Sequence, residues 1–131
     1  AVTGPLGNEE GLLRFVGEPE GLCAFIWHEF GHSVINPLTS KHLEELATFD
    51  DLIEPIAAQM QEQAYGEWEF CLNEHVVRAC VIRLLELQFS AERARELLDY
   101  DRARGFYLLD PLLDWIIVYE RNLERYANFA E

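Results

Sequence analysis

Residues 26–33 contain the pattern His-Glu-x-x-His, with His28, Glu29 and His32 at its defined positions. On a helix, residues four positions apart lie one turn apart on the same face, so both imidazoles can bind one metal ion. Zinc is the ion that favours such a pair, and Glu29 can reach a zinc-bound water without binding the metal itself. The pattern therefore predicts a zinc site on a helix, with Glu29 as the general base that takes a proton from the water.

The residues around this pattern are mostly apolar, and their character helps to decide between two interpretations. The same spacing can arise by chance on a solvated helix face, where the polar groups need no partner. Here the motif belongs to a mostly apolar segment that includes Phe25, Ile26, Trp27 and Phe30. Burying imidazoles and a carboxylate without partners costs on the order of a few kcal/mol per group, and a bound metal removes that cost. The setting therefore favours the metal site.

A third ligand is needed, because a catalytic zinc takes three protein ligands and a water. The extended pattern HExxHxxGxxH is absent, since Ile35 and Leu38 stand where it requires Gly and His. We predict Glu74 as the third ligand, because it interrupts the apolar positions of a second predicted helix and so points toward the core. A buried carboxylate needs a strong partner, which zinc would supply. An ion pair with Arg78, one turn later, is the alternative.

Two other histidines compete with Glu74 for the role of third ligand. His75 is adjacent to Glu74 and therefore points about 100° away around the helix. His42 follows His32 by ten residues and falls in a predicted connection. Most histidines at such positions are surface or internally satisfied groups, so both remain secondary candidates.

Apart from its first residues, the chain has the periodicity of a helical protein. Residues 1–11 are rich in Gly, Pro and polar groups and predict a loop, and residues 12–16 predict a short strand. Helices are expected over residues 19–34, 42–49, 52–65, 67–89, 90–104 and 106–129. We therefore predict a mainly α fold and a single domain over residues 1–131, in which 1–18 form a loop and short strand and 19–131 are helical. At most one or two short strands precede the helices.

Local signals mark several of the predicted helix boundaries. Asn36-Pro37 is expected to end the motif helix. Asp50 lies between the helices predicted over residues 42–49 and 52–65, and it is expected to cap the second of them. Ser90 is expected to cap the helix after it, and Gly105 to end that helix. Asp110-Pro111 marks the start of the last helix.

The composition excludes several classes of partner. The 131 residues include 24 acidic and 10 basic ones, which gives a formal net charge of −14 and argues against nucleic acid and anionic membranes. The three cysteines provide no complete disulfide framework and no pair with zinc-ligand spacing. No apolar run is long enough to cross a bilayer, and no signal peptide is visible, so we expect a soluble chain. Compartment and oligomeric state have no sequence signal.

The chain also resembles a known group of enzymes. HExxH followed by Asn73-Glu74 resembles the zincin metallopeptidases of the gluzincin type, in which a glutamate from a later helix completes the site. More narrowly, residues 20–129 resemble a bacterial family of uncharacterised domains that are candidate zinc metallopeptidases. The blocks that carry this resemblance are HEFGHSVINPL, QAYGEW, NEHVVRACVIRL and GFYLLDPLLDWIIVYERNLERY.

The resemblance implies a fold, a cofactor and a substrate class. It implies a zincin-like helical catalytic core in which His28, His32 and Glu74 hold Zn2+ and Glu29 is the general base, with a peptide or protein as substrate. Zincin domains usually have a sheet before the HExxH helix, whose edge strand aligns the peptide. Only 18 residues precede the predicted helix here. We therefore expect either the C-terminal part of a larger α+β domain or an incomplete substrate groove.

Catalysis would need further groups around the zinc. Tyr107, beside the Gly105 junction, is our first candidate for the donor that stabilises the oxyanion, with His75 and Arg78 as others. The alternative for Tyr107 is a packing aromatic. Carboxylates are expected to hold the second nitrogen of each ligand histidine. The candidates for this role are Glu44, Glu45, Asp50, Glu67 and Asp110.

Three classes of function therefore stand side by side. The first is a zinc-dependent metallopeptidase, which the intact Glu29 favours, because a purely structural zinc site has no use for a base. The second is a zinc-binding module without catalysis. The third is a metal-free helical interaction domain that presents Trp27, Trp68 and Trp115 at its surface.

Overall fold

The computed structural model describes residues 5–9, 12–15, 18–126 and 128–129, and most of this part of the chain is helical. The elements in chain order are β1 (Pro5–Glu9), β2 (Leu12–Phe15), α1 (Pro19–Lys41), α2 (Leu43–Leu46), the 3-10 helix η1 (Ala47–Ile56), α3 (Ala57–Glu62), α4 (Trp68–Gln88), α5 (Ala91–Ala103) and α6 (Leu109–Arg121). The predicted mainly α fold with one or two short N-terminal strands is confirmed.

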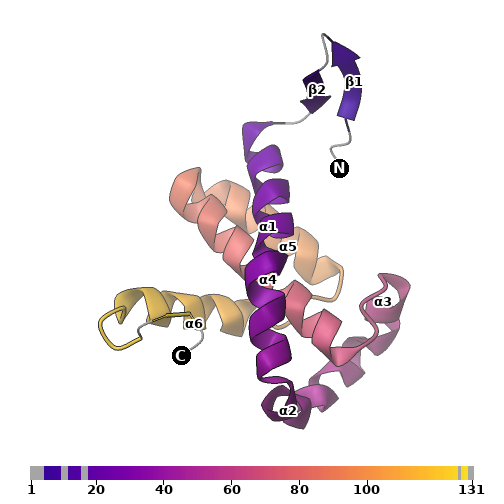
Figure 1. Ribbon diagram of the computed structural model, residues 1–131, viewed down its shortest axis with the longest axis vertical. Helices are drawn as coiled ribbons and strands as arrows, with labels where there is room; N and C mark the ends of the chain where they lie inside the picture. The colour runs from indigo at the N-terminus through magenta and orange to yellow at the C-terminus, as the bar shows by residue number, and fades with distance from the viewer. Residues whose placement is uncertain (1–4, 10–11, 16–17, 127, 130–131) are drawn as a thin grey trace.

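The two strands form an antiparallel hairpin beyond the N-terminal end of α1 (Figure 1). The strand predicted over 12–16 is confirmed for Leu12–Phe15, and Val16 lies outside the described residues. The loop predicted over 1–11 is wrong for Pro5–Glu9, which pairs with β2. Backbone pairing between neighbouring segments outweighs the low strand propensity of the Gly, Pro and Asn in this segment. Residues 1–4 and 10–11 lie outside the described part.

Helix α1 carries the HExxH motif and runs further than predicted. Pro19 occupies its first turn, as expected, but the helix passes through Pro37 and ends at Lys41. Two contacts with α4 hold this extension: Thr39 donates to Asn73 Oδ1 at 2.5 Å, and Ser40 donates to Glu69 Oε1 at 2.7 Å. Packing against α4 therefore outweighs the backbone hydrogen bond that a proline within a helix cannot make.

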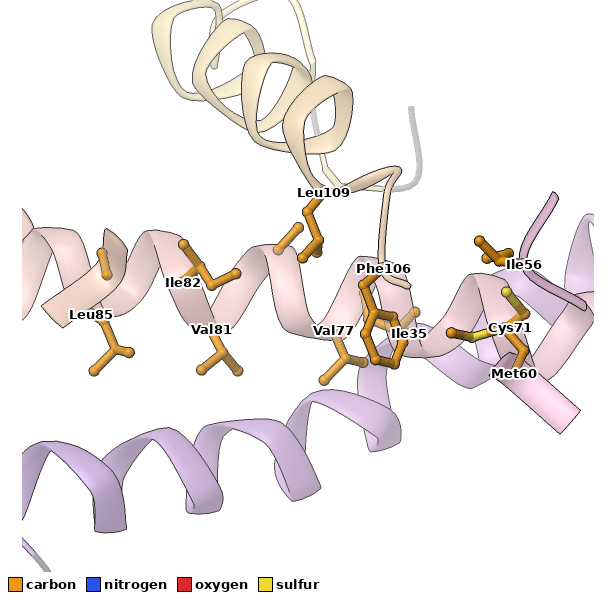
Figure 2. Close-up of a cluster of buried hydrophobic side chains, with 12 residues drawn as sticks. Ile35, Ile56, Met60, Cys71, Val77, Val81, Ile82, Leu85, Phe106 and Leu109 are labelled. Atoms are coloured by element: carbon orange, nitrogen blue, oxygen red, sulfur yellow. The ribbon is translucent and has the colours of Figure 1, made fainter. Parts of the chain in front are cut away.

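Helix α4 lies at the centre of the molecule, with α1, α5 and α6 packed around it (Figure 1). Its buried side chains include Val77, Val81 and Leu85, which Figure 2 shows lined up along the helix toward α1. The apolar positions around Glu74 that predicted one buried stripe on this helix are Phe70, Val77, Val81 and Leu84. This prediction is wrong for Phe70 and Leu84, which are exposed. A helix with neighbours on several sides buries more than one face.

A close approach of α1 to α4 positions the motif. A Cβ added at Gly31 would lie 3.1 Å from Val77 Cγ1, so this glycine lets the two backbones come together. The apolar residues on the other side of α1 are not packed, since Phe25, Ile26 and Phe30 are exposed. The burial expected around the motif is therefore wrong for these three residues, and it is only the face of α1 toward α4 that is covered.

The predicted boundaries of the later helices are mostly confirmed. The Ser90 hydroxyl accepts a hydrogen bond from the Arg93 backbone N–H at 3.1 Å, as a helix cap does, and Gly105, with φ 97°, ends α5. Asp50 is not a cap, because η1 runs through it and the kink falls at Phe49. The last helix ends at Arg121, before the predicted 129, because the Asn122 side chain donates to the Val118 carbonyl. In the described part of the chain, no helix is long and apolar enough to cross a membrane.

Candidate metal centre

The two motif histidines and Glu74 meet between α1 and α4. His28 Nε2 lies 3.2 Å from His32 Nε2 and 3.6 Å from Glu74 Oε2, and His32 Nε2 lies 3.1 Å from Glu74 Oε1. These residues form the one group of three or more potential metal ligands found in the described part of the chain. The predicted ligand set is thus brought together from two helices, and His32 and Glu74 are more than forty positions apart in sequence.

The spacing of these atoms fits a tetrahedral ion. With metal–ligand bonds of about 2.0–2.1 Å, two ligand atoms of a tetrahedral zinc site lie about 3.3 Å apart. The two histidine nitrogens lie 3.2 Å apart, His32 Nε2 lies 3.1 Å from Glu74 Oε1, and His28 Nε2 lies 3.6 Å from the other carboxylate oxygen, Oε2. Both imidazoles and the carboxylate are also the ligand types that zinc accepts. The donor set therefore fits zinc in both chemistry and separation.

The second nitrogen of His32 has a partner on its own helix. Nδ1 lies 3.1 Å from Asn36 Oδ1, one turn further along α1. An Nδ1–H that donates to this oxygen leaves Nε2 with a lone pair directed at Glu74 and His28. Acceptors that converge in this way need a cation or a proton between them. The carboxylate predicted for this role is therefore wrong for His32, where an amide takes its place.

Glu74 is buried, at 5 % exposure, and it has partners on both sides. Arg78 Nη2 donates to Glu74 Oε2 at 2.9 Å, while Oε1 faces His32. Burial opposes ionisation, but hydrogen bonding with His28 and the charge of Arg78 outweigh it, so the pKa of Glu74 is lowered. The predicted ligand geometry and the alternative ion pair with Arg78 therefore occur together, with one carboxylate oxygen left for a metal.

Arg78 is itself held by a residue that the sequence analysis did not identify. Arg78 Nη1 donates to Asp101 Oδ1 at 2.9 Å, and its guanidinium lies 4.2 Å from the centre of the Phe106 ring. Asp101 is 1 % exposed. Burial raises the pKa of its carboxyl group, and this effect exceeds the lowering caused by the positive charges of Arg78 and Arg104. An acidic residue in the last turn of α5 is unfavourable to the helix dipole, and this position was the signal available in the sequence.

Tyr65 is a tyrosine next to the cluster. It lines the same hollow as His32 and Glu74, and burial followed by the charge of Glu74 raises its pKa. Tyr107, the predicted oxyanion donor, lines neither hollow at the cluster. Its hydroxyl donates to the Leu52 carbonyl at 2.6 Å, so the packing alternative fits it better.

The competing histidines are outside the cluster. His75 is fully buried, with Nδ1 2.8 Å from the Cys71 carbonyl oxygen and its ring centre 5.0 Å from that of Phe106. Burial lowers the pKa of His75, which keeps it neutral. His42 Nδ1 lies 3.7 Å from Glu45. Neither histidine belongs to the group of potential metal ligands, which consists of His28, His32 and Glu74.

The other carboxylates named as supports do not contact the ligand histidines in the described residues. Asp110 pairs with Arg102, and no contact of Glu44, Asp50 or Glu67 with His28 or His32 occurs there. Glu29 is exposed on α1, next to His28, and makes no hydrogen bond or ion pair within the described part of the chain. Its carboxylate is therefore accessible to solvent.

Two hollows adjoin the cluster from opposite directions along α1. The N-terminal hollow, of about 310 Å³, is lined by residues that include Gly21, His28, Leu97 and Asp101. The C-terminal hollow, of about 190 Å³, is lined by residues that include His32, Asn36, Tyr65 and Glu74. Solvent-accessible space therefore reaches His28 from one side and His32 and Glu74 from the other.

Comparison with known proteins places the chain in one family. The family described as "Domain of unknown function (DUF4932)" matches residues 2–131. The chain belongs to this family. No curated protein and no solved structure matches it. The family description assigns no activity, so the gluzincin resemblance of this DUF4932 domain stays a prediction.

Proposed function

We propose that this DUF4932 domain is a zinc-dependent hydrolase, most closely a metallopeptidase, that binds its metal through His28, His32 and Glu74. The observation that carries the proposal is the convergence of two histidine nitrogens and one carboxylate at 3.1–3.6 Å between α1 and α4. A glutamate adjacent to the first of these histidines then supplies the base that such chemistry requires.

The protein residues around the site have distinct roles in the proposed reaction. Zinc, when bound, supplies a Lewis acid that polarises the substrate carbonyl and lowers the pKa of a water. Glu29 accepts the proton of the attacking water and passes it to the leaving amine. Tyr65, which lines the C-terminal hollow with His32 and Glu74, would donate a hydrogen bond to the carbonyl oxygen as it gains negative charge. Arg78 holds Glu74 by one oxygen and leaves the other for the metal.

The metal content of purified protein tests the first half of this proposal. We expect about one zinc per chain after zinc is supplied and the excess removed. His32→Ala should lose this zinc. His42→Ala removes a histidine outside the cluster and should keep it. Wild-type protein that holds no zinc would leave a metal-free helical interaction domain as the better description.

Peptide cleavage tests the second half. Zinc-loaded wild-type protein should hydrolyse some members of a mixed peptide library, with the products read by mass spectrometry. Glu29→Gln should keep the zinc and abolish the cleavage, because the amide cannot accept the proton. Zinc binding without cleavage in wild-type protein would favour a zinc-binding module without catalysis.

A further inference from the structure

The guanidinium group of Arg78 is shared between two acidic residues that lie on different helices. Nη2 donates to Glu74 Oε2 at 2.9 Å, and Nη1 donates to Asp101 Oδ1 at 2.9 Å. The carbon Cζ lies over the Phe106 ring, 4.2 Å from its centre. The Arg78 side chain is 12 % exposed, so water has little access to it. The guanidinium therefore has a fixed place, from which it gives one nitrogen to each carboxylate.

A buried arginine with a single carboxylate partner favours a different arrangement. The N–H groups of a guanidinium form a planar fork that matches both oxygens of one carboxylate, and pairs of this kind are among the strongest hydrogen bonds in proteins. Glu74 lies one turn before Arg78 on the same helix, which is the usual spacing of such a pair. Here, however, Arg78 donates to Oε2, while Oε1 of Glu74 lies 3.1 Å from His32 Nε2. A further group must therefore hold the other end of the fork.

Asp101, in the last turn of α5, is the group that does this. It is 1 % exposed, and a carboxylate so deeply buried needs a cation close to it. Arg78 lies 2.9 Å from its Oδ1, whereas Arg104 lies 3.5 Å from the same oxygen, so Arg78 is the nearer cation. Two buried carboxylates thus compete for one guanidinium, and the division between them leaves Oε1 of Glu74 to the histidines.

We propose that Asp101 is a positioning residue of the metal site. By taking one end of the Arg78 guanidinium, it keeps Arg78 from pairing with both oxygens of Glu74 and so leaves Oε1 available to the metal. The inference rests on the proposed function for the identity of the metal. It adds that the third ligand is controlled from α5, a helix that supplies no ligand of its own. Loss of Asp101 changes Arg78 from a support of Glu74 into a competitor of zinc.

The zinc affinity of the full chain tests this role, measured by competition with a chromophoric chelator on variants that circular dichroism shows to be folded. Asp101→Ala should bind zinc about 10–100-fold more weakly than wild type. Asp101→Asn keeps the shape and one acceptor oxygen, so it serves if the alanine variant does not fold, and it should lose at least about threefold. Asp99→Ala removes an exposed acidic residue of the same helix and should change the affinity less than roughly twofold. Wild-type affinity in both Asp101 variants overturns the proposal.

A second substitution separates competition by Arg78 from a general loss of structure. Arg78→Met, added to Asp101→Ala, removes the competitor and leaves zinc as the cation for Glu74. Removing both members of a buried ion pair is also tolerated better than removing one. We expect the double variant to recover a zinc affinity within about threefold of wild type. If it binds zinc no better than Asp101→Ala does, Asp101 acts through the stability of the fold alone and the proposal fails.

A crystal structure of the zinc-free Asp101→Asn protein tests the same step without the metal. We expect Arg78 to lie within hydrogen-bond distance of both Glu74 oxygens. A guanidinium that still donates to Oε2 alone overturns the proposal, whatever the protein does to peptides. The pair with both oxygens in this variant, together with wild-type protein that takes up no zinc or cleaves no peptide, would refute the hydrolase and keep the role of Asp101 in placing Glu74.

Discussion

Two helices, α3 and α5, end next to the candidate metal centre with the same backbone turn but different residues. In α3, Tyr65 N–H donates to the Met60 carbonyl at 2.8 Å and Ala64 N–H to the Gln61 carbonyl at 3.1 Å. In α5, Phe106 N–H donates to the Asp101 carbonyl at 3.2 Å and Gly105 N–H to the Arg102 carbonyl at 3.0 Å. Both pairs are the hydrogen bonds of a Schellman motif.

The difference lies in the residue that takes the left-handed conformation. Gly105 has φ 97°, which a glycine adopts without strain, while Ala64 has φ 67°, which costs an L-residue roughly 1–2 kcal/mol. The residues after them, Tyr65 and Phe106, contact each other with ring centres 6.3 Å apart. One end is thus relaxed and the other strained, and the strained end presents the tyrosine to the cluster. Strain of this kind is often found at functional sites.

The largest expected effect comes from the acidic residue in the last turn of α5. Asp101→Ala should lower the free energy of unfolding by about 3–5 kcal/mol. The reason is that Arg78 is mostly buried and loses one of the two carboxylates that pair with it, and only Glu74 remains. Urea denaturation measures the change. Asp99→Ala removes an exposed acidic residue of the same helix, paired with Arg102, and should cost about 1 kcal/mol or less. Equal losses in the two variants would mean that the Arg78 bridge adds nothing to stability.

Gly105→Ala should remove the advantage of the relaxed end. The added Cβ would lie 2.7 Å from Gln59 Oε1 and 3.2 Å from Met60 Cε, at a φ that alanine rarely adopts. We expect a loss of about 1–3 kcal/mol in the free energy of unfolding. A thermal denaturation midpoint unchanged from wild type would contradict the geometry of this turn.

Ala64→Gly should relieve the strained end. The substitution removes the left-handed penalty, in part offset by the greater freedom of glycine in the unfolded chain, for a net gain of about 0.5–1 kcal/mol. The measurement is the same denaturation curve as for Gly105→Ala, so that the two turns are compared directly. A loss of stability would refute the comparison.

The two carboxylates that flank Arg78 should respond to pH in opposite ways. The pKa of Glu74 is lowered, so its stabilising contribution is present above the unfolded pKa and is lost as pH falls through the folded pKa. The pKa of Asp101 is raised, so stability declines as pH rises from the unfolded pKa through the folded one. Each group changes the slope of the unfolding free energy against pH by the equivalent of less than about one bound proton.

Unfolding of zinc-free protein between neutral pH and about pH 3 resolves these slopes. Glu74→Gln should flatten the loss of stability toward acid, and Asp101→Asn should steepen it, because the opposing contribution is gone. If Glu74→Gln leaves the loss of stability at acidic pH unchanged, the pKa of Glu74 is not lowered in the folded state.

Much of the site follows from short-range spacing, which a sequence contains in full. His28 and His32 share a face because they are four residues apart on a helix, and Ser90 and Gly105 bound α5 by their own backbone chemistry. Glu74 was placed toward the core because it breaks an apolar pattern. Those inferences need no knowledge of how the helices pack.

Other features depended on packing and could not be predicted in this way. The helix passes Pro37 because α4 binds Thr39 and Ser40. A left-handed alanine at position 64 has no sequence signal, since the turn chemistry there would ordinarily call for glycine. Tyr65 therefore reached the cluster from a turn whose form the sequence does not indicate.

The sequence by itself determined the identity of the proposed metal ligands and the helical faces on which they lie, because both follow from the helix repeat. Only the tertiary structure decided how those ligands are supported. Arg78 bridges Glu74 on its own helix to Asp101 on another, and Asn36 takes the place of the expected carboxylate. The physical reason is that a buried charge accepts any partner of opposite charge within reach, and reach is set by the packing of helices that are distant in sequence.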